Sequence, residues 1–341
     1  MSYPVPSTQY PVPINERNRH DPPFSIAIHG GAGTIERSLM TPELEAGYRK
    51  ALAQSVLAGY TVLEQGGTAV DATVAAVTVM EDSELFNAGK GSVLTYEETV
   101  EMDASVMDGS NLDAGAVTLI RHIKNPVQLA RDVMRKSPHA MLAGEGAETF
   151  AFKECGYDYI EQDYFFTDRR YNELKMMKKI GGVALSEARY PDEKKYGTVG
   201  AVAMDKDGNL AAATSTGGLT NKRWGRVGDT PIIGGGNYAR NGNVAVSATG
   251  MGELLMRCTV AGDIAGRMQF GNASIEQACR DVIHGDFLRL GGEGGVIAID
   301  ATGQVNFELN CPGMYRATAN ENGEALVAIF ADEALRVESG N

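Results

Sequence analysis

Thr198 is the residue of this sequence whose surroundings most directly suggest chemistry. It follows Gly197 and stands at the head of an apolar, strand-like run, residues 199–204. If the Gly197–Thr198 bond were cut, Thr198 would carry a nucleophilic hydroxyl and an α-amine base in one residue. The simpler interpretation is a β-branched residue that starts a strand, because threonine favours strands. Segments elsewhere in the chain bear on this choice.

Two segments downstream of Thr198 carry groups that suit a substrate site. Residues 214–218 end a predicted strand with hydroxyls, and residues 225–231 place Arg226 and Asp229 in a glycine-flanked loop. Arginine offers a fork for a carboxylate and aspartate accepts from an ammonium, so the pair would suit the head of an amino acid. An ordinary surface ion pair is the alternative for these two residues.

Two glycine-rich segments add further candidates. Residues 234–236 are three glycines that form a flexible turn, and residues 249–253 lie at a predicted strand-to-helix junction. There the Thr249 hydroxyl and free backbone N–H groups could form an oxyanion hole, although Gly-x-Gly before a helix also suits phosphates. His29, in the loop 29–33, could act as a general base or could order its turn.

The elements that must position these residues follow from periodicity and turn chemistry. We expect strands at 24–28, several short ones within 92–120, and strands at 198–204, 210–215, 244–249 and 295–299. We expect helices at 41–65, 69–80, 126–134, 141–152, 253–269 and 274–284. Residues 157–196 are rich in charge and predict a helix at most, followed by a mobile linker. Helices that flank two groups of strands predict a layered α/β sandwich.

Composition restricts the partners of this chain. Its net charge of −13 argues against nucleic acid or an anionic membrane surface as a partner. It contains no run of 18 apolar residues, which a membrane span needs. Four widely spaced cysteines without a CxxC pair favour reduced thiols and a cytoplasmic protein. Residues 1–23 repeat Tyr-Pro-Val-Pro and have no apolar signal-peptide core, so they predict a disordered, proline-rich tail.

Several motifs together resemble one family. They are Gly-Thr-Val-Gly-Ala-Val-Ala, Thr-Ser-Thr-Gly-Gly, Gly-Arg-Val-Gly-Asp-Thr-Pro and Ala-Thr-Gly-Met-Gly-Glu, preceded by segments 29–33, 85–89 and 103–109. In this order they resemble the plant-type asparaginase/isoaspartyl peptidase family of N-terminal nucleophile (Ntn) hydrolases. The resemblance covers roughly residues 24–317. It implies an αββα four-layer sandwich, the Ntn-hydrolase fold, as a single domain over residues 24–341.

The resemblance also implies a reaction and its residues. The precursor would cut itself between Gly197 and Thr198 into an α chain, 1–197, and a β chain, 198–341. Thr198 would then attack the side-chain amide of L-asparagine or of a β-aspartyl (isoaspartyl) dipeptide. The implied supporting residues are Thr216 beside the nucleophile, Thr249 and Gly250 as the oxyanion hole, Asn87 near the nucleophile, Arg226 and Asp229 on the substrate α-carboxylate and α-ammonium, and Gly252 in the substrate pocket.

The resemblance implies no cofactor for catalysis. It implies a dimer of αβ heterodimers. The loop 81–90 resembles a loop in which a structural sodium ion is held mostly by backbone carbonyls, and its implied ligands are Glu81, Ser83, Phe86, Ala88 and Lys90. Glu84 departs from a common proline there. Met251 stands where relatives more often have a small polar residue or histidine, and Trp224 stands where a smaller residue is usual. Both differences bear on substrate preference, and Met251 bears on the leaving-group side of the pocket.

Two alternatives remain from the sequence. A glycosylasparaginase would use the same nucleophile, but such relatives usually carry Asp-Thr at the cut, where this chain has Gly197 before Thr198. A catalytically silent protein could instead recognise aspartate-like amino acids through Arg226 and Asp229 without cleaving itself.

Overall fold

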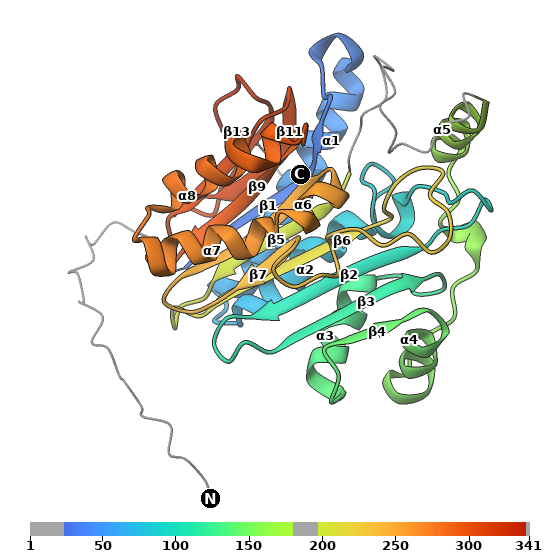
Figure 1. Cartoon of the computed structure of the whole chain (residues 1–341), viewed down its shortest axis with the longest axis horizontal. Helices are drawn as coiled ribbons and strands as arrows, with labels where there is room; N and C mark the ends of the chain where they lie inside the picture. The colour runs from blue at the N-terminus through green and yellow to red at the C-terminus, as the bar shows by residue number, and fades with distance from the viewer. Residues whose placement is uncertain (1–23, 180–196, 339–341) are drawn as a thin grey trace, which may run out of the picture.

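The computed structural model describes residues 24–179 and 197–338. The predicted tail, 1–23, and most of the predicted linker, 180–196, lie outside the described residues. The described part is a mixed α/β structure with two sheets, which confirms that part of the expected fold (Figure 1). Within it, no helix combines the length and apolar character that crossing a membrane requires.

The secondary structure has the following bounds. The strands are β1 Ser25–Gly33, β2 Met102–Asp108, β3 Ala114–Ile120, β4 Met141–Ala143, β5 Val199–Met204, β6 Leu210–Thr216, β7 Asn237–Ala239, β8 Val244–Gly250, β9 Gly294–Asp300, β10 Val305–Leu309, β11 Gly313–Ala319, β12 Ala325–Phe330 and β13 Arg336–Glu338. The α-helices are α1 Pro42–Glu64, α2 Ala69–Glu81, α3 Pro126–Lys136, α4 Gly144–Phe150, α5 Asp168–Lys179, α6 Gly252–Arg257, α7 Val260–Gly271 and α8 Ile275–Val282.

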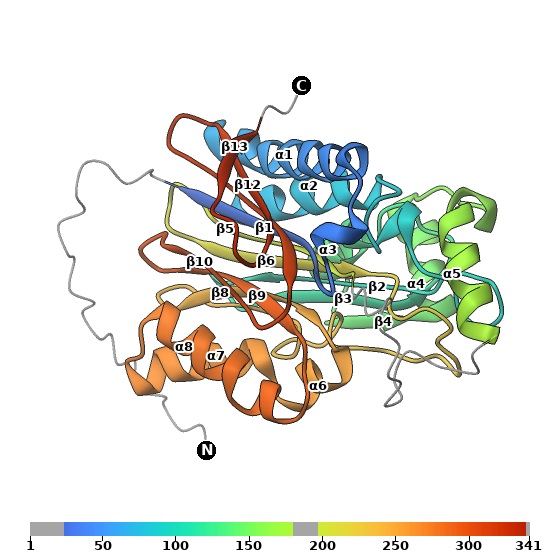
Figure 2. The same cartoon turned by 90° about the horizontal axis from the view of Figure 1, so that it is seen from above.

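The two sheets face each other between layers of helices (Figure 2). The larger sheet has the order β13-β12-β11-β1-β5-β6-β2-β3-β4, and the smaller has the order β10-β9-β8-β7. Helices α1, α2 and α3 pack on one face of the larger sheet, and β8 and β9 pack on its other face against β1 and β5. Helices α7 and α8 cover the outer face of the smaller sheet. The ends of β5, β6 and β8 are thereby brought together.

Local capping explains the first two helices, which were predicted almost to the residue. The Thr41 side chain accepts a hydrogen bond from Leu44 N at 3.2 Å, and Pro42 opens α1. Thr68 caps α2 in the same way through Asp71 N, at 3.1 Å. Each cap satisfies an amide that has no partner inside the helix.

Two predicted helices are wrong in part. The helix expected at 141–152 begins as the short strand β4, which pairs in parallel with β3, and turns helical only from Gly144. The helix expected at 253–269 is broken between α6 and α7 at Thr259, whose φ is +46°. Backbone amides in the first turn of α7 donate hydrogen bonds to the glycine turn at residues 234–236 and not to α6. For example, Gly262 N donates to Gly234 O at 2.9 Å.

Several strands were not predicted. Strand β1 continues through residue 33 by means of a register shift between His29 and Ala32, where a loop was expected. The short strand β7 and the strands β10 to β13 were missed, and β11 is the neighbour of β1 in the centre of the larger sheet. Residues 92–101 contain no strand.

Candidate active site

Thr198 is buried at the head of β5, with its hydroxyl directed at the end of β6. Thr198 Oγ1 donates to Thr216 Oγ1 at 3.2 Å, and the Thr216 hydroxyl donates to the carbonyl oxygen of Gly197, also at 3.2 Å. Gly218 N donates to Thr216 Oγ1 at 3.0 Å and so fixes its orientation. Thr216 therefore contacts both the candidate nucleophile, Thr198, and the Gly197 carbonyl that Thr198 would attack.

Asn87 lies beside the same bond and leaves no room for a side chain at position 197. Its amide Nδ2 donates to Gly218 O at 2.8 Å, and its Oδ1 accepts from Val93 N at 2.9 Å. A Cβ atom on Gly197 would lie 2.7 Å from the Cβ of Asn87, closer than such atoms approach. The glycine before Thr198 is therefore required by packing.

A buried polar chain holds the backbone of Thr198. His29 Nδ1 donates to the carbonyl oxygen of Thr198 at 3.0 Å, and His29 Nε2 accepts from the Ser247 hydroxyl at 2.8 Å. The Thr214 hydroxyl lies 2.8 Å from Ser247 Oγ. Burial lowers the pKa of His29 to about 3, so the ring is neutral near pH 7.

These contacts decide between the two roles considered for His29. Both ring nitrogens are occupied, one by a backbone carbonyl and one by Ser247, so His29 orders the backbone at Thr198 and does not contact the Thr198 hydroxyl. Ser247 was missed as a site residue, and Thr214 was predicted only as part of the segment 214–218, without a role of its own. The available signal was the presence of hydroxyl residues in the buried strands β8 and β6, because a buried hydroxyl needs a partner.

A small pocket of about 10 Å³ joins the nucleophile to the loop that was predicted to grip the substrate. Thr198, Thr216, Arg226, Asp229 and Gly252 are among the residues that line it. The structure thus brings together residues that the motifs placed in one site. Gly197, the residue before the candidate nucleophile, also lines the pocket.

Arg226 does not form the simple ion pair with Asp229 that the sequence allowed. Its Nε and Nη2 donate to the two carboxylate oxygens of Glu253, at 2.7 and 2.9 Å. This bidentate pair fixes the orientation of the guanidinium and occupies its Nε–Nη2 edge. Glu253, at the first turn of α6, was quoted within a motif but its contact with Arg226 was not foreseen. The Nη1 edge of Arg226 faces Gly228.

Asp229 is a buried carboxyl that forms no ion pair within residues 24–179 and 197–338. Its Oδ2 has no hydrogen-bond partner among the described residues. Burial raises the pKa of Asp229 to about 7, while the charge of Arg226 acts in the opposite direction. A Cβ on Gly252 would lie 2.8 Å from Asp229 Oδ1, so glycine there leaves the carboxyl open to the pocket. An ammonium group would satisfy this carboxyl.

The end of β8 provides candidate oxyanion donors. The Thr249 hydroxyl is buried and has no hydrogen-bond partner in the described part of the chain. Gly250 lines the pocket with φ +142°, and a Cβ there would lie 2.4 Å from Glu293 O. Thr230 also lines the pocket with an unpartnered hydroxyl in the described part, and sequence reasoning missed it.

The loop 81–90 crowds backbone carbonyls around two glycines. A Cβ on Gly89 would lie 2.3 Å from Glu81 O, and a Cβ on Gly91 would lie 2.1 Å from Phe86 O. The side chains of the loop are used elsewhere, since Lys90 pairs with Glu84 at 2.8 Å. No cluster of three His, Cys, Asp or Glu residues suited to a metal occurs within residues 24–179 and 197–338. The carbonyls packed against positions 89 and 91 therefore require glycine at both.

Glu81 has a second, structural use of its side chain. Its carboxyl accepts from Ser215 Oγ at 2.6 Å and from Val127 N at 3.0 Å. Burial raises its pKa to about 8. Glu81 thereby ties the end of α2 to β6 next to Thr216.

Met251 and Trp224, the two departures near the substrate motifs, do not line the pocket, although Met251 stands between Gly250 and Gly252, which do. Met251 N donates to Glu293 O at 3.1 Å, and the Met251 side chain packs against the core beneath α7 and α8. Trp224 is 91% exposed and has φ +58°. Neither residue lines the pocket that contains Thr198.

Comparison with known proteins gives a consistent family. A family model described as "Asparaginase" matches residues 23–329. The chain is 51% identical to the isoaspartyl peptidase of Escherichia coli over 310 residues, which cover 90% of this chain and 96% of the relative. It is 48% identical to an isoaspartyl peptidase/L-asparaginase of Xenopus laevis over 279 residues, 82% and 86% of the two chains. A Mus musculus protein of the same description is 44% identical over 278 residues, 82% of each chain.

Proposed function

The chain belongs to the asparaginase family, and on this premise we propose that it is a self-processing threonine amidohydrolase for β-aspartyl dipeptides and L-asparagine. The observation that carries the proposal is the pair of Thr216 contacts, one to the Thr198 hydroxyl and one to the Gly197 carbonyl. They align nucleophile and electrophile in the uncut chain.

Self-cleavage would begin as an N→O acyl shift. Thr198 Oγ adds to the carbonyl carbon of Gly197, the C–N bond breaks, and the hydroxyl proton ends on the Thr198 nitrogen. Water then hydrolyses the ester, which releases the Gly197 carboxylate and regenerates the hydroxyl. The products are chains 1–197 and 198–341, and the second begins with a free amine.

Substrate hydrolysis would repeat this chemistry on a side-chain amide. The Thr198 α-amine, with an ordinary pKa of about 7.7–8, takes the hydroxyl proton as Oγ attacks. The Thr249 hydroxyl and the Gly250 N–H would stabilise the oxyanion. The amine then protonates the leaving nitrogen, and water hydrolyses the acyl-enzyme to give aspartate.

Arg226 and Asp229 would orient the substrate by its α-groups. Arg226, whose Nε and Nη2 are held by Glu253, would meet the α-carboxylate through its remaining N–H groups, and the Asp229 carboxyl, whose Oδ2 has no hydrogen-bond partner among the described residues, suits the α-ammonium. Gly252 lies between the two side chains and would leave room for the α-carbon. These two contacts would make the site selective for aspartyl amides, which carry both an α-carboxylate and an α-ammonium.

The remaining expectations belong to the same proposal. The layer order helix, sheet, sheet, helix supports the αββα Ntn-hydrolase fold as one domain over 24–341. Each step above uses groups of this chain and water. From the resemblance of the loop 81–90 we also propose a structural sodium ion, with Glu81, Ser83, Phe86, Ala88 and Lys90 as its backbone ligands; of these, the carbonyls of Glu81 and Phe86 lie against Gly89 and Gly91. We further expect a cytoplasmic dimer of αβ units, which sedimentation and cell fractionation would test.

The decisive experiment is the mass of freshly purified protein under denaturing conditions. Wild-type protein should give two fragments, the second starting at Thr198, and Thr198→Ser should give the same two. Thr198→Ala should remain one chain and should hydrolyse neither L-asparagine nor a β-aspartyl dipeptide. A wild-type chain that stays full-length would refute the proposal and favour the silent binding protein.

A glycosylasparaginase is disfavoured by the packing at the cut. Aspartate in place of Gly197 would bring its Cβ against Asn87, at 2.7 Å. The site of this chain is therefore built around glycine at that position. Comparing β-Asp-Leu with a glycosylated asparagine as substrates distinguishes the two activities directly.

A further inference from the structure

A second cavity, of about 130 Å³, adjoins the Gly197–Thr198 bond and has no role in the steps above. Gly197 lines both this cavity and the small pocket that contains Arg226 and Asp229. The two spaces therefore meet at the residue that self-cleavage would release from Thr198.

We propose that this second cavity, which we call the leaving-group cavity, binds the amino acid that departs from a β-aspartyl dipeptide. The proposal rests on the proposed function. When the substrate C–N bond breaks, the acyl group is on Thr198 Oγ and the departing nitrogen takes its proton from the Thr198 ammonium. That nitrogen must lie beside Thr198 N, where the Gly197 carbonyl is attached before self-cleavage. Release of Gly197 opens this position toward the leaving-group cavity.

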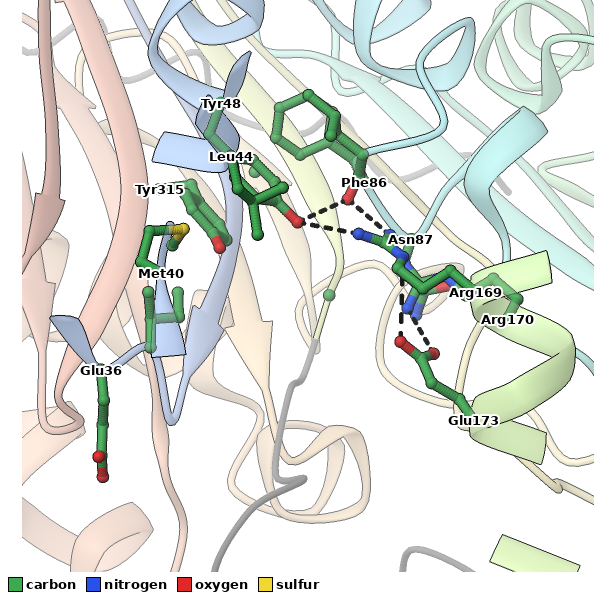
Figure 3. Close-up of a pocket in the computed structure, with 14 residues that line it drawn as sticks. Glu36, Met40, Leu44, Tyr48, Phe86, Asn87, Arg169, Arg170, Glu173 and Tyr315 are labelled. Atoms are coloured by element: carbon green, nitrogen blue, oxygen red, sulfur yellow. Dashed lines mark hydrogen bonds and ion pairs between the residues drawn. The ribbon is translucent and has the colours of Figure 1, made fainter. Parts of the chain in front are cut away.

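One wall of the leaving-group cavity is aromatic and closely packed (Figure 3). Tyr48 and Tyr315 stack with ring centroids 4.1 Å apart, and Phe86 meets Tyr48 edge-on at 5.7 Å. All three side chains are buried, so the wall is formed before any ligand arrives. A volume of about 130 Å³ is close to that of cavities of roughly 150 Å³ that hold one benzene ring. The cavity thus fits one large apolar or aromatic side chain.

Beside the aromatic wall, α5 contributes a positive charge to the cavity. Arg169 Nη1 donates to Tyr48 Oη at 3.2 Å, and its Nη2 donates to Leu85 O at 3.0 Å. Its Nε reaches Glu173 only at 3.9 Å, because that carboxylate pairs with Arg170 at 2.9 Å. Arg169 is therefore fixed in place with a charge that Glu173 balances only at a distance.

A carboxylate would complete this arrangement. The amino acid that leaves a β-aspartyl dipeptide has a free α-carboxylate, and Arg169 could pair with it while the side chain contacts the aromatic wall. L-Asparagine loses only ammonia and would not use the cavity. The chain should therefore prefer β-aspartyl dipeptides whose second residue is large and apolar, such as β-Asp-Phe or β-Asp-Leu.

The test compares substrates on the self-cleaved enzyme. kcat/KM is measured for β-Asp-Phe, β-Asp-Gly, β-Asp-Phe amide and L-asparagine. We expect β-Asp-Phe to exceed β-Asp-Gly and its own amide by about tenfold, the effect of one apolar side chain or one charged contact. Arg169→Gln should reduce the ratio of β-Asp-Phe to L-asparagine by about tenfold. Lys179→Gln, which removes an exposed charge from the end of the same helix, should leave that ratio unchanged.

A second variant guards against misfolding of the Arg169 variant. Leu44→Trp adds bulk from α1 at the edge of the cavity, and should lower kcat/KM for β-Asp-Phe far more than for β-Asp-Gly. Equal kcat/KM values for the three dipeptides, unchanged in both variants, would overturn the leaving-group cavity but leave the proposed function intact. A cleaved enzyme that hydrolyses none of the four substrates would overturn both.

Discussion

At the scale of single residues, Asp229 connects burial to the expected pH dependence of binding. A carboxyl in this pocket is costly to ionise, so its pKa rises to about 7, and only the ionised form attracts an ammonium. The charged form is lost as the pH falls through that value. Affinity for an aminated ligand should therefore fall with it.

Calorimetric titration of the cleaved enzyme with L-aspartate tests this expectation. Lowering the pH from 7.5 to 5.5 should weaken binding through Asp229 roughly 25-fold, as expected for one group with this pKa. Succinate has the two carboxylates but no ammonium, so it should not show this loss, and it controls for titration of the Thr198 amine. Asp229→Asn should bind L-aspartate weakly at both pH values. An equal pH response of the two ligands would contradict the role of Asp229.

At the scale of elements, the approach of β5 to β8 positions the nucleophile. Gly200 follows Thr198 by two residues and faces the smaller sheet. A Cβ there would lie 2.0 Å from Ser247 Oγ and 2.5 Å from His29 Nε2. Only glycine allows the two sheets to close over the polar chain that holds the Thr198 carbonyl.

Gly200→Ala should therefore slow self-cleavage and destabilise the fold by about 1–3 kcal/mol, as overpacking does. Gly266→Ala is the matched control, because nothing lies within 4 Å of a Cβ at this position inside α7. Gly266→Ala should raise the free energy of unfolding by at most about 1 kcal/mol, the difference between glycine and alanine in a helix. Gel analysis of cleavage over time and urea unfolding measure both effects. If Gly200→Ala cleaved itself at the wild-type rate, the spacing of the two sheets would not control the rate of self-cleavage.

Elements with local signals could be predicted, and those set by distant partners could not. The caps at Thr41 and Thr68 lie within the sequence that they terminate, so α1 and α2 were found. The break at Thr259 depends on a loop that precedes it by more than twenty residues, and the apolar periodicity runs through it unchanged. The strands β10 to β13 gave no motif, and only their pairing makes their place evident: β10 with β9, β11 with β1, β12 with β11 and β13 with β12.

The site divides in the same way. Motifs placed Thr198, Thr216, Arg226 and Asp229 in one pocket, as the structure has them. The contact of Glu253 with Arg226 and the leaving-group cavity could not be foreseen. The walls of that cavity come from α1, α5 and β11, which are far apart in the sequence and meet only through packing. Met251 was suggested by its departure from the family pattern, which does not predict that its side chain packs against the core beneath α7 and α8.

At the scale of the whole molecule, the larger sheet interleaves strands from both sides of the proposed cut. β1 and β2 precede residue 197, whereas β5, β6 and β11 follow it, and the order is β11-β1-β5-β6-β2. β1 pairs along both of its edges with strands of the other fragment, for example Ile28 opposite Ala201 and Ala317. The two fragments therefore share one sheet and one core.

Cleavage should consequently leave a single particle. Native mass spectrometry of the cleaved enzyme should show both fragments in equal number, and size-exclusion chromatography should give the elution volume of uncut Thr198→Ala. In urea, the fragments should separate only in the transition in which the secondary structure is lost, because no strand of the shared sheet can leave without breaking its ladder. Fragments that separate without denaturant would show that the interleaved strands do not hold the cleaved molecule together.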